Sequence, residues 1–349
     1  MKPIKVGIIG CGFISHAHAI AAQKTDGRVK IVAATSRDKA KLSAWCAQYD
    51  AKPFENIGQM LSQIALDGVI IATPPSQHFE SIALCIDAGI KAILCEKPLL
   101  TDLENCIKIK EMAASANCRV LEGFMYRHHF AFHEFIEHSK NIGKLDTIFA
   151  QFNMNLDNGK DNWRQNDKAN GGIAFDFLCY PIDFCNLVAN SNPKSTFAFG
   201  NFNPNSGLLE KLSGLVEYEN GVTATVRVSG HSSFSQKIIL SGSRGQIEMP
   251  IGFAISNHAQ IVTTRTEKFI DQIVATREIA IENNDGTLTQ SLAFEQQLNH
   301  FCDVIEGKMP PLCGIDHALK NLKVTLGLIS SLEKRQPYEF SHCIGGMEK

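Results

Sequence analysis

The chain has 349 residues, of which 44% are hydrophobic and 20% are charged, and its formal net charge is -2. This length and composition predict two globular domains with hydrophobic cores and argue against a disordered or fibrous chain. Because 34 Lys and Arg residues face 36 Asp and Glu residues, the sequence offers no excess of basic charge for a nucleic acid or an anionic membrane.

The cysteine pattern and the first residues of the sequence bear on the cellular compartment of the protein. Met1-Lys2-Pro3 leads directly into an apolar strand pattern, without the long apolar region and cleavage site of a signal peptide, and no later apolar run is long enough for a membrane span. The eleven cysteines include no C-x-x-C pair and many lie in apolar patterns, as is typical of reduced thiols. We expect a cytoplasmic protein.

The N-terminal segment has the pattern strand, glycine turn, helix. The apolar run Ile4–Ile9 ends in the turn Gly10-Cys11-Gly12-Phe13-Ile14-Ser15, and His16–Lys24 has helical periodicity. Gly10 and Gly12 allow a sharp turn and a close approach of the backbone, and the helix N-terminus offers N–H groups to a pyrophosphate. Ser15 replaces the third glycine of the dinucleotide-binding fingerprint. The segment therefore predicts a dinucleotide site.

The second strand pattern, Val29–Ala34, bears on which dinucleotide binds. An NAD site places a carboxylate at this strand end for the ribose 2′-OH, whereas a 2′-phosphate needs hydroxyl donors and cations. Here the strand end carries Ser36 and Arg37, with Lys41 one helical turn later, and Asp38 stands where a helix N-cap would be. These cations favour NADP(H) as the cofactor, and NAD(H) is the alternative. It is also possible to interpret Arg37 and Lys41 as the solvated start of a helix, without a role in cofactor binding.

Two further strand ends carry polar residues. The apolar run that starts at Asp67 leads into Thr73-Pro74-Pro75-Ser76-Gln77-His78, where the prolines remove N–H donors and stiffen the loop, so that Thr73 and His78 are expected to face the glycine turn. The next run, Lys91–Cys95, leads into Glu96-Lys97-Pro98. Open α/β sheets bind ligands at such strand ends, so Lys97 can meet both cofactor and substrate. The alternation of strands and helices predicts a doubly wound parallel sheet.

The second half has a different pattern. From Leu145 onward, longer alternating runs such as Thr147–Asn155 and Val222–Ser229 predict a large, mostly antiparallel sheet. Among these runs, Asp176, Tyr180 and Asp183 have the spacing i, i+4, i+7, which on one helix places two carboxylates and a phenol on one face. The alternative is that Tyr180 is a core residue and Asp183 a surface charge.

The sequence gives little support for a metal site or for a serine nucleophile. The histidines of His128-His129 and His133–His138 do not form an i, i+4 helical pair with a third ligand, so we expect no metal site. A G-x-S-x-G nucleophile motif is also missing from the sequence.

Three motifs in fixed order, GCGFIS, ATPPSQH and CEKP, resemble the glucose-fructose oxidoreductase/inositol dehydrogenase/MocA-type family. The segment Gly123–His128 (GFMYRH) looks like the EAFMYRFH segment of the dihydrodiol dehydrogenase and aldose 1-dehydrogenase branch, and GGIAFDFLCYPID is similar to the family pattern G-G-x-x-x-D-x-x-x-H/Y-x-x-D. The resemblance implies an N-terminal Rossmann domain (residues 1–122) and a C-terminal α+β domain with the antiparallel sheet (residues 123–349), the final helix packing back on the first domain.

The resemblance also implies site residues. Asp176 and Tyr180 are expected to act together with Lys97, and the Lys97–Pro98 peptide is expected to be cis. The cofactor residues are expected to be Gly10, Cys11, Gly12, Phe13, Ile14, Ser36, Arg37, Lys41, Thr73, Pro74, His78, Glu96 and Lys97. Tyr126, Arg164 and Asp183 are expected near the substrate. The free face of the C-terminal sheet is expected to form a homodimer or homotetramer.

The expected function is an NAD(P)-dependent oxidoreductase for a sugar, polyol or cyclic diol. A phenol is a poor base near neutral pH, so Tyr180 needs a cation to favour its phenolate, and Lys97 is the available cation. Two alternatives stay open: an NAD-dependent glycosidase that oxidises its substrate transiently, and a cofactor-binding regulator without activity. The sequence specifies neither the substrate nor the direction of the reaction.

Overall fold

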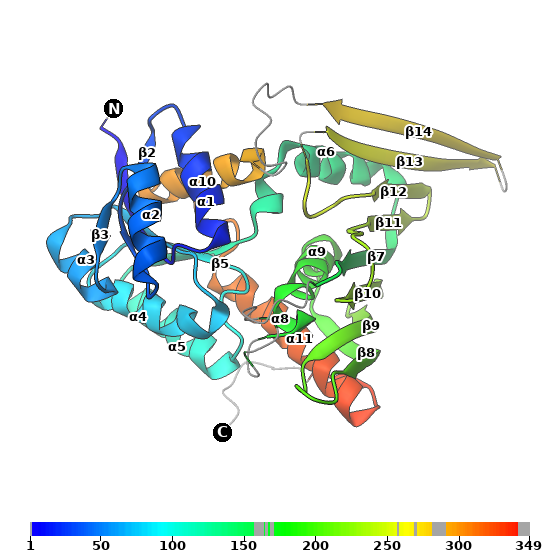
Figure 1. Ribbon diagram of the computed structural model, residues 1–349. Helices are drawn as coiled ribbons and strands as arrows, with labels where there is room; N and C mark the ends of the chain where they lie inside the picture. Colours follow the sequence, from blue (N-terminus) through cyan, green and yellow to red (C-terminus); the bar gives the residue numbers. More distant parts are fainter. Residues whose placement is uncertain are drawn as a thin grey trace. The chain divides into compact units, whose positions relative to one another are not determined.

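The computed structural model describes residues 2–156, 164, 167, 171–256, 258–268, 271–280 and 291–340 (Figure 1). The chain forms two compact units, each assembled from segments that are distant in sequence. Unit 1 comprises residues 1–134, 254–259 and 279–319, and unit 2 comprises residues 135–253, 260–278 and 320–349. The domain boundary expected after residue 122 stays a prediction.

Unit 1 is built on a six-stranded parallel sheet with the strand order β3-β2-β1-β4-β5-β6. Its strands are β1 (Ile4–Ile9), β2 (Val29–Thr35), β3 (Lys52–Phe54), β4 (Gly68–Ile71), β5 (Ala92–Glu96) and β6 (Arg119–Gly123). Its helices are α1 (Phe13–Gln23), α2 (Lys39–Tyr49), α3 (Ile57–Gln63), η1 (Pro75–Gln77), α4 (His78–Asp87), α5 (Leu103–Ser115), η2 (Met125–His128) and α10 (Ser291–Ile305). The doubly wound parallel sheet is thus confirmed.

Helices connect the parallel strands of the six-stranded sheet. Helix α10, from the C-terminal part of the sequence, packs against α1, whereas α3, α4 and α5 form a row of neighbours. The central strands are buried on both sides, and Val6, Ile8 and Ile70 are fully buried. Helix α1 begins at Phe13, three residues before the expected His16, because Gly12 occupies its N-cap position.

Unit 2 is built on a nine-stranded sheet with the order β14-β13-β12-β11-β7-β10-β9-β8-β15. Its strands are β7 (Leu145–Asn153), β8 (Pro193–Phe202), β9 (Leu209–Tyr218), β10 (Thr223–Ser229), β11 (Ile238–Gly242), β12 (Gly245–Met249), β13 (His258–Lys268), β14 (Asp271–Ala280) and β15 (Tyr338–Glu339). Its described helices are η3 (Lys140–Ile142), α8 (Ile173–Asp176) and α9 (Cys179–Ala189), together with the C-terminal parts of α6 (Phe130–Ser139) and of α11 (Ile315–Lys334).

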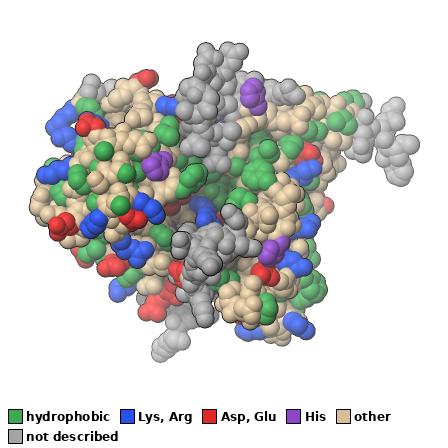
Figure 2. Space-filling model, in the orientation of Figure 1, with side chains coloured by type: hydrophobic (Ala, Val, Ile, Leu, Met, Phe, Trp, Pro, Cys, Tyr) green, Lys and Arg blue, Asp and Glu red, His purple; other side chains and the backbone are tan. Residues whose placement is uncertain are grey.

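The nine-stranded sheet is mostly antiparallel, as expected. Strands β7 and β10 are parallel neighbours, whereas β10 with β9, β7 with β11 and β8 with β9 are antiparallel. Along β7 and β10 buried and more exposed residues alternate, so one face of the sheet forms a core with α9. On the surface shown in Figure 2, described acidic and basic side chains lie interspersed, as the near-zero net charge suggests.

Candidate functional site

The glycine turn lies at the end of β1, where the backbone leaves the sheet. Gly10 has φ +97°, and a Cβ atom there would lie 2.7 Å from the carbonyl oxygen of Ala72. Only glycine fits this conformation and this close approach. No side chain caps the following helix at Gly12, so the first-turn N–H groups of α1 point to the strand end, as an anion site requires.

A cavity of about 680 Å³ lies at this end of the parallel strands. Eight of the residues expected to hold the cofactor line it: Gly10, Cys11, Gly12, Ser36, Arg37, Lys41, Thr73 and Pro74. Its lining does not include the other expected residues, which are Phe13, Ile14, His78, Glu96 and Lys97. Burial raises the pKa of the Cys11 thiol to about 12, so this lining residue is uncharged. Arg37 and Lys41 line the cavity together with Asp38, Glu55 and Glu80, and the glycine turn fits the pyrophosphate of a dinucleotide.

The start of α2 shapes the rim of this cavity. Asp38 caps the helix: its carboxylate accepts a hydrogen bond from the Lys41 N–H at 3.0 Å, and the Lys41 ammonium lies 3.5 Å from its second oxygen. These interactions, led by the backbone hydrogen bond, hold the pKa of Asp38 below its usual value. Arg37 is exposed beside it. The N-cap expected at Asp38 is confirmed, and its carboxylate is engaged by the helix.

His78 links the loop after β4 to the turn after β5. Its ring is fully buried, with Nε2 2.9 Å from the Thr73 carbonyl oxygen and Nδ1 3.0 and 3.1 Å from those of Pro98 and Leu99. Burial lowers the pKa of His78, while the three carbonyl groups oppose this shift. The Lys97–Pro98 peptide is cis, as the resemblance implied. His78 thus contacts backbone carbonyls and is not part of the cavity lining.

Glu96 and Glu122 are buried carboxylates on neighbouring strands. His18 Nε2 of α1 lies 2.8 Å from Glu96, and the Glu122 Oε1 accepts a hydrogen bond from the Leu99 N–H at 2.8 Å. Sequence reasoning assigned no role to His18 or to Glu122. Single polar residues in apolar runs carry no spacing signal, so only the strand register, which pairs Cys95 with Glu122, reveals this arrangement.

The expectation of one helix carrying Asp176, Tyr180 and Asp183 is wrong. Helix α8 ends at Asp176 and α9 begins at Cys179, with a turn at residues 177 and 178 between them. Pro181 explains the break, since proline lacks an N–H donor and its ring would clash with the carbonyl of Phe177 in a continuous helix. Proline is tolerated within the first turn of α9.

The side chains of this segment are buried within unit 2. Asp176 is 4% exposed and forms an ion pair with Arg164 Nε at 2.5 Å. Tyr180 is 6% exposed, and its ring stacks on Phe152 at a centroid distance of 4.9 Å. Asp183 is fully buried and accepts a hydrogen bond from Asn321 at 3.2 Å. Phe152 is on β7, so the sheet fixes the direction of the Tyr180 ring.

Tyr126, the segment around Arg164 and the loop after β10 are three separate regions of the structure. Tyr126 is fully buried in unit 1, where its ring meets Phe132 edge-on at 4.9 Å. Arg164 lies in the segment of residues 157–169, of which the structure describes only Arg164 and Asp167. The loop from Gly230 to Ser235 follows β10, and its first residue bonds to the Glu210 carbonyl of β9.

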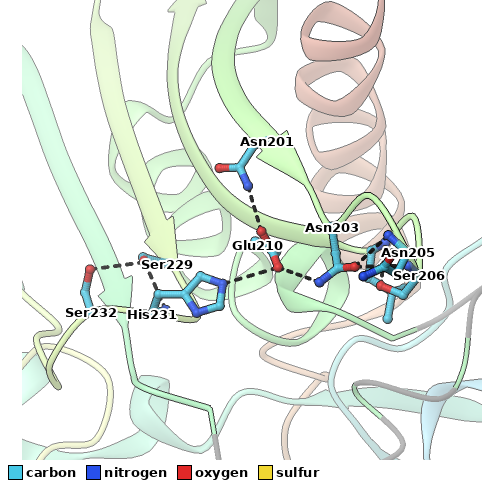
Figure 3. Close-up of polar contacts among 9 residues, drawn as sticks. Asn201, Asn203, Asn205, Ser206, Glu210, Ser229, His231 and Ser232 are labelled. Atoms are coloured by element: carbon cyan, nitrogen blue, oxygen red, sulfur yellow. Dashed lines mark hydrogen bonds and ion pairs between the residues drawn. The ribbon is translucent and has the colours of Figure 1, made fainter. Parts of the chain in front are cut away.

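A polar network joins the ends of β8, β9 and β10 in unit 2 (Figure 3). Glu210 accepts hydrogen bonds from the side-chain amides of Asn201 and Asn203, both at 2.7 Å, and His231 Nε2 lies 3.4 Å from the same carboxylate. Gly172, just before α8, lies close to this part of β9, since a Cβ atom there would be 3.1 Å from the Leu209 carbonyl oxygen. Sequence reasoning missed this network because its members are single polar residues far apart in the chain.

Metal-binding clusters and membrane-spanning helices are both missing from the described part of the chain. Among these residues, no group of three or more His, Cys, Asp or Glu side chains could hold a metal ion. None of the described helices is long and apolar enough to cross a membrane.

Comparisons with known proteins agree with this geometry. A model of the oxidoreductase family with an NAD-binding Rossmann fold matches residues 4–124, and a GFO/IDH/MocA C-terminal domain model matches residues 133–248. The chain is 25% identical to D-xylose 1-dehydrogenase (NADP(+)) 2 of Haloferax volcanii, covering 72% of this chain and 76% of that protein. It is 24% identical to trans-1,2-dihydrobenzene-1,2-diol dehydrogenase of Xenopus tropicalis, covering 92% and 98%.

Among solved structures, a 3-ketoreductase of Actinomadura kijaniata in complex with NADP and TDP-benzene is similar, with a TM-score of 0.83 and 20% identity. The match covers 95% of this chain and 98% of that one, which shows a shared fold. Since the two family models together span most of the chain, it belongs to the GFO/IDH/MocA family of NAD(P)-binding oxidoreductases.

Proposed function

We propose that the protein is an NADP(H)-dependent dehydrogenase or reductase acting on CH–OH groups of a sugar, polyol or cyclic diol (EC 1.1.1 or 1.3.1 type). The observation that carries this proposal is the cavity at the glycine turn, whose Thr73 loop is joined by His78 to the turn that carries Lys97. The proposed cofactor site and Lys97, the proposed cation of the reaction, thus belong to the same unit.

The choice of NADP(H) follows from the charges at the rim. Ser36, Arg37 and Lys41 line the cavity, and the carboxylate of Asp38 is held at the N-cap of α2. A ribose 2′-phosphate is matched by such cations and hydroxyl groups. One relative carries NADP(+) in its name, and a protein of the same fold was solved with NADP, which supports the same choice.

Each of the three proposed catalytic residues, Tyr180, Lys97 and Asp176, has its own role in the reaction. When bound, the nicotinamide supplies or accepts the hydride. Tyr180 takes the proton of the reacting hydroxyl group in oxidation and returns it in reduction. Lys97 polarises the substrate oxygen and, as a cation, favours the phenolate of Tyr180. Asp176, buried and ion-paired with Arg164, orients these groups by charge-assisted hydrogen bonds.

Of the three residues expected near the substrate, we propose only Arg164 as a substrate contact. Arg164 is retained as a substrate residue because it is partly exposed, with 30% of its side chain accessible, and is oriented by Asp176. Tyr126 and Asp183 are fully buried, so we assign Tyr126 to packing within unit 1 and Asp183 to hydrogen bonding within unit 2. The substrate class follows the printed names of the relatives, a sugar dehydrogenase and a diol dehydrogenase.

A spectrophotometric screen tests the function. Purified protein is incubated with NADP⁺ or NAD⁺ and with D-xylose, D-glucose, myo-inositol or trans-1,2-dihydrobenzene-1,2-diol, and absorbance is followed at ~340 nm, where reduced nicotinamides absorb. We expect stoichiometric NADPH formation with at least one substrate. Substrate conversion without net NADPH formation, or tight NADP⁺ binding without any turnover, would contradict the proposal.

The outer face of the nine-stranded sheet suggests self-association. Phe199 is 70% and Leu215 is 54% exposed, and the register places Leu215 next to Phe197. Exposed apolar side chains grouped on one sheet face are typical of an interface. We propose a homodimer or homotetramer formed by this face. Leu215→Glu should then lower the mass measured by analytical ultracentrifugation, and a wild-type mass of one chain would exclude the assembly.

A further inference from the structure

The turn that carries Lys97 directly follows the end of β5. Strand β5 ends at Glu96, so the chain leaves the sheet at Lys97. Nevertheless, the next three residues, Pro98, Leu99 and Leu100, are buried. Buried backbone N–H and C=O groups must find other hydrogen-bond partners, since an unpaired group is costly.

Glu122 provides one of these partners. It is 3% exposed on β6, and its Oε1 accepts the N–H of Leu99 at 2.8 Å. A hydrogen bond from an N–H group to a buried carboxylate is stronger than one between neutral groups. The contact therefore holds Leu99, two residues after Lys97, against the neighbouring strand.

The second oxygen of Glu122 faces His317, which is itself in contact with Arg127. Oε2 lies 3.8 Å from Nδ1 of His317, and Arg127 donates to the Nε2 of the same ring at 3.2 Å. Because Nε2 accepts from Arg127, the ring proton is on Nδ1, on the side of Glu122.

His78 holds the turn from another element. Its Nδ1 lies within 3.1 Å of the carbonyl oxygens of Pro98 and Leu99, and its Nε2 lies 2.9 Å from that of Thr73, which lines the cofactor cavity. The N–H and C=O of Leu99 are therefore contacted by two side chains from two different elements, α4 and β6. Such a turn has little freedom to shift.

We propose that Glu122 is a positioning residue for Lys97: by binding the Leu99 N–H, opposite the contact from His78, it fixes where the Lys97 ammonium lies. This inference rests on the proposed function of Lys97. Lys97 directly precedes the fixed turn and is itself partly exposed. A displacement of about 1 Å in a reacting group lowers turnover by up to about 100-fold, so a loosened Leu99 is expected to affect catalysis.

The test compares Glu122→Ala with Glu122→Gln. Glutamine keeps a carbonyl oxygen that can accept the Leu99 N–H, whereas alanine removes the acceptor. With NADP⁺ and each of D-xylose, D-glucose and trans-1,2-dihydrobenzene-1,2-diol, Glu122→Ala should lower kcat about 10- to 100-fold, and Glu122→Gln should stay within about 3-fold of wild type. The KM for NADP⁺ should change little in both. Ile109→Val, a buried change on α5, controls for lost stability.

Two further measurements separate positioning from a general loss of structure. Hydrogen exchange at the Leu99 amide should be slow in wild type and Glu122→Gln, and fast in Glu122→Ala. In a Lys97→Met background, Glu122→Ala should cause no further loss of the residual rate, because it acts through Lys97.

The possible failures are distinct. If Lys97→Met keeps near-normal turnover, the proposed function of Lys97 is wrong and the inference falls with it. If Lys97→Met is inactive but Glu122→Ala matches Ile109→Val in kcat, only the inference is wrong. A protected Leu99 amide in Glu122→Ala, or equal losses for the alanine and glutamine variants, would also overturn it.

Discussion

Replacement of Arg37 by alanine should shift the cofactor preference of the enzyme. Arg37 is exposed at the rim of the cofactor cavity, next to the N-cap of α2. A guanidinium–phosphate hydrogen bond contributes about 1.5–3 kcal/mol, and exposure to water and salt places this contact near the lower limit. Since about 1.4 kcal/mol corresponds to a factor of ten, the KM for NADPH should rise about tenfold. The KM for NADH, which lacks the 2′-phosphate, should change less than about 2-fold.

Replacement of Lys41 adds a second effect. Its ammonium lies 3.5 Å from Asp38, so Lys41→Ala removes one cation and also the ion pair with the Asp38 carboxylate, which keeps its hydrogen bond to the N–H of residue 41. In the double variant Arg37→Ala/Lys41→Ala, the two losses of about 1.4 kcal/mol each should add. The KM for NADPH should therefore rise about 100-fold.

Initial rates with both reduced cofactors and a carbonyl substrate from the screen measure these constants. Lys30→Ala is the matched control, because Lys30 is exposed in the same unit, pairs with Asp50 and does not line the cofactor cavity. The preference for NADPH should also weaken as the salt concentration rises. Equal increases in KM for NADPH and NADH would refute the reasoning.

Three other predictions concern catalysis, cofactor binding and stability in acid. Tyr180→Phe and Lys97→Met should each lower kcat by about 10²–10⁴-fold while NADPH still binds, as measured by fluorescence titration, and near-normal rates in both would contradict their roles. Gly10→Ala should abolish NADPH binding, because its Cβ would meet the Ala72 carbonyl at 2.7 Å, whereas Gly27→Ala, at φ +75° in open space, should bind normally. The free energy of unfolding should fall in acid. Burial lowers the pKa of His128 in the folded protein to about 3, whereas its pKa in the unfolded chain is about 6.5. Between these two pH values only the unfolded state binds the proton, which favours unfolding. Urea unfolding at pH 5 should therefore show about 2 kcal/mol less stability than at pH 7.5 from this residue, and His128→Asn should remove that part of the difference.

Local chemistry made much of unit 1 predictable. The bounds of β1 are those expected, because a short apolar run that ends in turn residues specifies a buried strand. The N-cap at Asp38 was expected because its side chain bonds to a backbone group three residues away. The turn at Gly10 likewise depends on a conformation that only glycine adopts easily.

The segment around Tyr180 shows where spacing alone misleads. The i, i+4, i+7 pattern predicted one helix, but α8 and α9 are separate. The sequence contained the reason, since Pro181 cannot follow four residues of uninterrupted helix without a clash. Backbone chemistry thus outweighs side-chain spacing in this segment.

The sequence by itself determined the order of strands and helices, the glycine turn, the basic rim beside Asp38 and the motifs that identify the family, because each depends on residues within about one turn of one another. Only the tertiary structure decided that Glu122 binds the Leu99 N–H, that His18 pairs with Glu96, and that Glu210 meets Asn201 and His231. These contacts join residues that are distant in sequence or that sit on neighbouring strands. Strand register and helix packing bring them together, and no local pattern contains that information.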